Sequence, residues 1–118
     1  MADLNQILKS LVDRSRDQKI TWRTTASPET YMTTIGEVSV AVSIASRQSG
    51  NTLYELEIID SRGVSVENLR SSPSKIFSSP AGQQRDEMLR RLFESARRSA
   101  LDIDSTLDEL ARQLDQIV

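Results

Sequence analysis

The chain has 118 residues, of which 37% are hydrophobic and 27% are charged, a composition typical of one folded, soluble domain rather than a disordered segment. It contains no Cys and no His, which excludes disulfides, thiolate or imidazole metal sites, Cys nucleophiles and His-based acid–base catalysis. The net charge of -2 creates no global field that would attract nucleic acid or an anionic membrane.

Residues 1–19 predict an N-terminal amphipathic helix. Asp3 stands at the expected N-cap, and Gln6 follows three positions later as in a capping box. The apolar residues that follow have the spacing of one buried helical face: Leu4, Ile7, Leu8, Leu11 and Val12. A run of polar residues after Val12 ends the predicted helix.

Residues 20–70 change to alternating apolar and polar positions, which predicts five strands. Ser27–Glu29, Gly36, Ser49–Asn51 and residues 60–63 supply the turns between them. Short connections favour an antiparallel meander, because parallel strands need long crossovers. The predicted inward-facing residues, strand by strand, are Ile20, Trp22 and Thr24; Tyr31, Thr33 and Ile35; Val38, Val40, Val42 and Ile44; Tyr54, Leu56 and Ile58; and Val64 and Val66.

Each predicted strand has one apolar face, so the sheet needs a helical layer on one side. The two terminal helices are the candidates for that layer. The sequence therefore predicts a single α+β domain over residues 1–118, with both helices on one face of a five-stranded antiparallel sheet. Between the sheet and the last helix, residues 71–82 are rich in Ser and Pro and predict a loop. Within that loop, Ile76 and Phe77 are candidate contact residues.

Residues 83–118 predict one long amphipathic helix. If straight, it would be about 50 Å long at 1.5 Å per residue, whereas a domain of this size is only about 30 Å across. Its far half therefore cannot bury its apolar side on its own domain. From Ala100 onward the apolar residues follow the alternating three- and four-residue spacing of a coiled coil: Ile103, Leu107, Leu110, Leu114 and Ile117.

A competing interpretation places a break at Asp102–Ser105, after which the second piece folds back as a helical hairpin. We favour the continuous helix, because the apolar phase is kept across that point and an independent helix has no reason to keep it. This interpretation requires a partner for the far half of the helix.

Charge is divided along the same helix. Residues 85–98 carry five arginines, including Arg97 and Arg98, against three acidic residues, whereas residues 102–115 carry one arginine against five acids, including Asp108. The simplest interpretation is a solvated face with i,i+4 ion pairs. Alternatively, two copies packed antiparallel would set the basic half of one against the acidic half of the other.

No motif indicates catalysis: the four glycines are scattered in turns, and no phosphate-binding loop, nucleic-acid-binding motif or calcium loop is present. We expect no enzyme activity, cofactor or metal. We also expect no nucleic-acid partner and no membrane association, since neither a signal peptide nor an apolar run of about 20 residues is visible. The expected location is therefore the cytoplasm.

The sequence thus predicts a protein–protein interaction module, such as a small adaptor, chaperone-like or immunity-like protein. It would form a homodimer through the C-terminal helix. The alternative is a small-ligand or peptide-binding domain that uses the open sheet face. There, Ser39 and Ser43 could offer hydroxyls, and a groove lined by Tyr31 or Tyr54 would favour this alternative.

Overall fold

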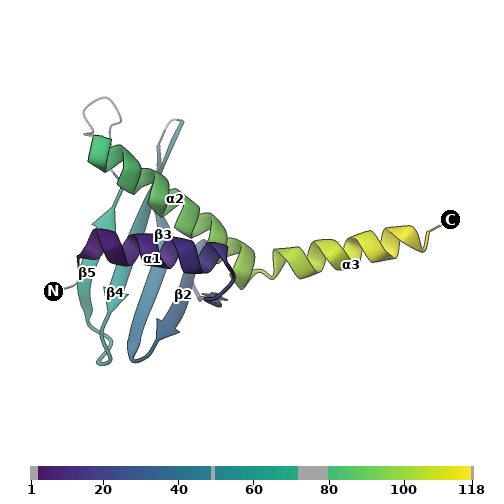
Figure 1. Cartoon of the computed structure of the whole chain (residues 1–118), viewed down its shortest axis with the longest axis horizontal. Coiled ribbons are helices and arrows are strands. Elements are labelled where there is room, and N and C mark those ends of the chain that lie inside the picture. Colours follow the sequence, from purple (N-terminus) through teal and green to yellow (C-terminus); the bar gives the residue numbers. More distant parts are fainter. Residues whose placement is uncertain (1–2, 49, 72–79, 118) are drawn as a thin grey trace.

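The structure, a computed structural model, describes residues 3–48, 50–71 and 80–117. It confirms the α+β architecture, with an N-terminal helix, a five-stranded antiparallel sheet and the C-terminal helical region after it (Figure 1). The elements in chain order are α1 (Leu4–Arg16), β1 (Arg23–Thr24), β2 (Thr30–Ile35), β3 (Val38–Gln48), β4 (Asn51–Ile59), β5 (Ser65–Arg70), α2 (Pro80–Ala100) and α3 (Ile103–Asp115).

The sheet is the predicted meander. Its strands lie in the order β1-β2-β3-β4-β5, and every neighbouring pair is antiparallel. One row of the register runs across four strands through Tyr31, Val42, Leu56 and Leu69. Since these side chains belong to the core cluster or pack against it, the row marks the face that the helices cover.

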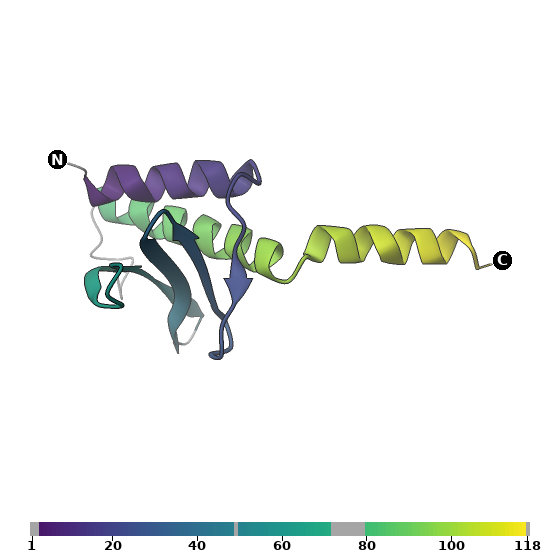
Figure 2. The same cartoon turned by 90° about the horizontal axis from the view of Figure 1, so that it is seen from below.

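The core lies between this face and the two helices α1 and α2, which cover the same side of the sheet (Figure 2). The Asp3 carboxylate caps α1, as predicted, by accepting a 3.0 Å hydrogen bond from the Asn5 backbone N–H. Phe93 of α2 contacts the rings of Tyr31 and Tyr54 at centroid distances of 5.5 and 5.2 Å. The largest fully buried side chains come from every layer: Trp22, Leu8, Leu56, Leu89, Leu92 and Val42.

The fifth strand differs from its prediction. Val64 precedes it and Val66 lies within it, and both side chains are about half exposed. Leu69 packs against the core instead, directly opposite Leu56 of β4. A register shift between Ile58 and Ile59 accompanies this change. At the other edge of the sheet, β1 is confined to Arg23–Thr24, so the predicted strand residue Ile20 lies before it.

The single helix predicted for residues 83–118 is wrong. Helix α2 begins earlier, at Pro80, and ends at Ala100; α3 begins at Ile103. Between them Asp102 adopts a left-handed conformation with φ of 52°, which no α-helix can include. The break thus includes Asp102, where the competing interpretation began it, but the fold-back hairpin is wrong, because α3 extends away from the domain (Figures 1 and 2). The radius of gyration is accordingly 16.1 Å, against about 13.5 Å for a compact chain of this length.

Candidate interaction surface

Helix α3 exposes the apolar residues that the sequence singled out. The name α3 stripe is used here for one side of α3, formed by Ile103, Leu107, Leu110 and Leu114, together with Ile117 just after the helix ends at Asp115. Leu107 and Leu110 are each 52% exposed, Leu114 is 56% exposed and Ile117 is 73% exposed. None of the residues of α3 is buried. The stripe is therefore an apolar surface with no core of its own chain against it.

Local interactions give α3 little stability. The Thr106 hydroxyl donates to the Asp102 carbonyl at 2.9 Å, and the Gln113 amide donates to Glu109 at 3.0 Å. Exposed pairs of this kind are worth about 0.2–0.5 kcal/mol each. An isolated helix shorter than about 12–15 residues is marginal in water, and α3 has 13 residues without a side-chain N-cap. Burial of the α3 stripe is the interaction that would stabilise this helix most.

The apolar residues of the two halves of the predicted helix differ in burial. In α2, Leu89, Leu92, Phe93 and Ala96 are at most 3% exposed, because they form the lid over the sheet. The basic half of the predicted helix therefore has no apolar side left for a second copy. Only α3 keeps one, so antiparallel pairing along the whole of residues 83–118 does not fit this fold.

The charged site residues lie near the junction between the two helices. Arg97 and Arg98 are in the last turn of α2 and are exposed, and Arg98 forms an ion pair with Asp104 of α3. Asp108 lies exposed on α3. Part of the basic charge is thus neutralised within the chain. Ile76 and Phe77, the predicted loop contacts, lie outside the described residues.

Other arginines of α2 are also paired internally. Glu87 accepts hydrogen bonds from Arg90 at 3.0 Å and from Arg91 at 3.1 Å. The hydrogen bond from Arg90, joined by that from Arg91, lowers the pKa of the Glu87 carboxyl to about 2. This cluster matches the simpler interpretation of the charges, a solvated face with local ion pairs.

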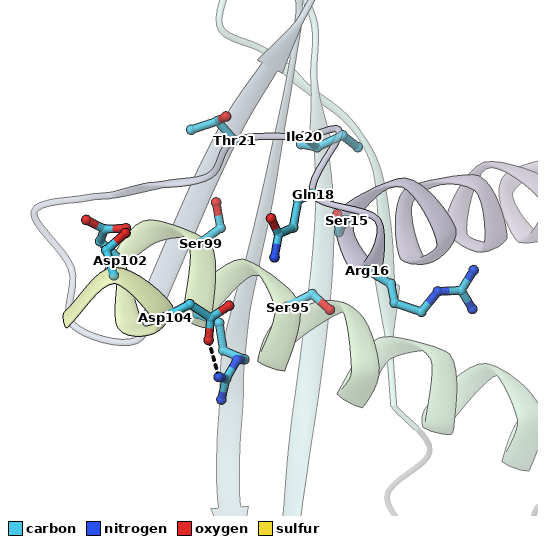
Figure 3. A pocket seen from close by; sticks show the side chains of 11 residues that line it. Ser15, Arg16, Gln18, Ile20, Thr21, Ser95, Ser99, Asp102 and Asp104 are labelled. Atoms are coloured by element: carbon cyan, nitrogen blue, oxygen red, sulfur yellow. Dashed lines mark hydrogen bonds and ion pairs between the residues drawn. The ribbon is translucent and has the colours of Figure 1, made fainter. Parts of the chain in front are cut away.

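A polar cavity of about 510 Å³ lies beside the junction (Figure 3). The end of α1, residues 18–21 and the α2–α3 junction line it, with Ser15, Ser99, Asp102 and Asp104 among its side chains. The Ser15 hydroxyl accepts a hydrogen bond from the Trp22 indole N–H at 3.0 Å, and the Ser99 hydroxyl accepts one from the Trp22 backbone N–H at 2.9 Å. These hydroxyls therefore serve to position Trp22. Sequence reasoning missed the cavity because its two segments are some 80 positions apart.

A second hollow, of about 390 Å³, runs along α1 and is apolar. It is here called the α1 groove, and its lining residues are Asp3, Gln6, Ile7, Ser10, Leu11, Arg14, Ile20 and Ile35. Ile7 is 37% exposed and Ile35 is 48% exposed, although the sequence predicted both to face the core. The ends of β2 and β3 extend beyond α1, so the helical layer leaves this end of the sheet bare (Figure 1). Val38, paired with Ile35, is 40% exposed there.

The sheet face that the helices leave open is lined by polar and charged side chains. Ser39 and Ser43 are half-buried on it, and Glu55 forms an ion pair with Arg70 at 3.3 Å on the same side. Tyr31 and Tyr54 instead contact Phe93 on the helix-covered face. The tyrosine-lined groove that would favour ligand binding on the open face is therefore not formed there.

Within the described part of the chain, acidic residues do not gather into a group of three that could hold a metal ion. No helix in that part is both long and apolar enough to cross a membrane. No family model, curated protein or solved structure matches the chain. Of the described surface, the α3 stripe and the α1 groove are the apolar features that the proposals use.

Proposed function

We propose that this protein is a non-catalytic protein–protein interaction module, of the adaptor, chaperone-like or immunity-like kind, that self-associates through the α3 stripe. The observation that carries the proposal is the exposure of Leu107, Leu110 and Leu114, which ranges from 52% to 56% on one side of a projecting helix, with Ile117 73% exposed just beyond its end.

The energetic argument rests on burial. Removing a Leu or Ile side chain fully from water contributes about 1.5–3 kcal/mol, so each half-exposed residue of the stripe would contribute roughly 1 kcal/mol on association. The same burial would hold α3 in its helical form. A second copy is a suitable partner, because a two-fold interface uses the same surfaces of both subunits. A cytoplasmic location is part of the proposal.

Sedimentation of purified protein at tens of micromolar tests the proposal. We expect the wild type to sediment as a dimer, and Leu107→Asp and Leu114→Asp to sediment as folded monomers. Ser105→Asp is the matched control: it adds the same charge in the first turn of α3, away from the stripe, and should remain dimeric. Fluorescence of Trp22, the only tryptophan in the chain, reports whether each variant is folded.

Two outcomes would contradict the proposal. One is a wild type that stays monomeric at these concentrations. The other is loss of the folded state in the Leu107→Asp and Leu114→Asp monomers, which would mean that the stripe packs within its own chain.

A further inference from the structure

We propose that the α3 stripe of one copy docks into the α1 groove of a second copy, in a reciprocal exchange in which each copy gives one helix and receives one. This inference rests on the self-association proposed above. It adds the site that receives the helix and the direction in which the helix lies.

The groove and the helix match in length. The α1 groove extends along α1 from Asp3 to Arg14, a distance of about 17 Å at 1.5 Å per residue. The 13 residues of α3 span about 20 Å. Docked beside α1, α3 would be the third helix of the layer. It would cover Ile35 and Val38, which α1 and α2 leave exposed at 48% and 40%.

The area argument favours the groove over a direct pairing of two α3 helices. Fully burying one aliphatic side chain removes about 60–120 Å² from water, so ten half-exposed residues of two stripes would remove at most about 600 Å². Stable protein–protein interfaces bury about 1,200–2,000 Å². Reciprocal docking covers two stripes and also two grooves, so it buries more apolar surface than the direct pairing of two stripes.

Charge gives the direction of the helix. The last turn of α1 carries Arg14 and Arg16, whereas Asp3 lies at its start. The first turn of α3 carries Asp104, and its last turn carries both Arg112 and Asp115. An α3 helix that runs antiparallel to the partner's α1 sets the acidic start of α3, with Asp104, beside Arg14 and Arg16. The two helix dipoles also oppose each other favourably in this arrangement.

A substitution in the groove tests the docking site without touching α3. We expect Ile35→Asp to weaken dimerisation at least tenfold. The matched control is Val66→Asp, because Val66 is 53% exposed in the edge strand β5, which β3 and β4 separate from the strand that holds Ile35. This control should leave the dimer unchanged. An Ile35→Asp variant that dimerises like the wild type overturns the inference.

Cysteine cross-linking tests the geometry on a background that contains no native Cys. Under mild oxidation, the double variant Ile7→Cys/Leu114→Cys should give disulfide-linked dimers, because the end of α3 would lie at the start of the partner's α1. Neither single variant should do so, and Ile7→Cys/Ile103→Cys should not either. Dimers linked by Leu110→Cys alone would indicate direct α3–α3 pairing, which overturns this inference but preserves the proposed function. A monomeric wild type overturns both.

Discussion

The Trp22 indole N–H donates a 3.0 Å hydrogen bond to the Ser15 hydroxyl inside the core, where the two residues are 2% and 6% exposed. The backbone N–H of the same Trp22 donates to Ser99 in the last turn of α2. One residue of a short connecting segment thus ties the end of α1 to the end of α2. It thereby fixes the point from which α3 projects.

We expect Ser15→Ala to lower the free energy of unfolding by about 1–3 kcal/mol, because the buried indole N–H loses its acceptor. Urea unfolding measures the change. Trp22→Phe removes the donor as well, so the double variant Ser15→Ala/Trp22→Phe should cost less than the sum of the two single changes. Strictly additive costs would show that this hydrogen bond contributes nothing.

The alternating and helical periods of the sequence were sufficient to predict the class of fold. They identified Trp22, Val42 and Leu56 as inward-facing residues, because period 2 assigns each strand residue to a face. The alternating period gave a wrong prediction for the fifth strand. There a register shift interrupts the alternation of faces, and the Val66 side chain is exposed.

The break between α2 and α3 could not be predicted from the apolar pattern. That pattern records which residues share a side of a helix, whereas the break is marked by the left-handed backbone of Asp102. The α1 groove was also missed, for a different reason. Its exposure depends on how far α1 and α2 reach across the sheet, which is a property of packing that no single segment contains.

Asp102 offers a direct test of the junction. A non-glycine residue in the left-handed region costs about 1–2 kcal/mol, a cost that Asp tolerates better than Ala. We expect Asp102→Ala to favour a continuous helix and to increase the helical signal in far-ultraviolet circular dichroism. Asp102→Gly should keep the break, since glycine adopts this conformation freely. Equal helical signals in the two variants would contradict this account of the junction.

The Glu87 cluster predicts a limited acid sensitivity. The pKa of Glu87 is lowered from 4.5 to about 2 by Arg90 and Arg91, so its contribution to stability is complete above pH 4.5 and is lost as the pH falls toward 2. Because the side chain is 44% exposed, the contribution is small, about 0.2–1 kcal/mol.

We therefore expect Glu87→Gln to be slightly less stable than the wild type at neutral pH and to match it near pH 2. Urea unfolding across this pH range measures the difference. A constant gap between the two proteins down to pH 2 would rule out the ion pair as its source.

Two leucines of the C-terminal region should respond differently to the same change. Leu92 is fully buried in α2, so Leu92→Ala should cost about 2–5 kcal/mol at any protein concentration. Leu110 is 52% exposed in α3, and alanine keeps the helical propensity there. In dilute monomer, Leu110→Ala should therefore change the free energy of unfolding by no more than about 0.5 kcal/mol.

At concentrations where the protein dimerises, folding is coupled to association, so the cost of Leu110→Ala should rise with concentration. Unfolding should be followed over a hundredfold range of protein concentration. The difference in free energy of unfolding between Leu110→Ala and the wild type should increase over that range. The loss of stability caused by Leu92→Ala should already be present in dilute protein. If Leu110→Ala were as costly as Leu92→Ala in the dilute monomer, α3 would be packed against its own chain rather than exposed for a partner.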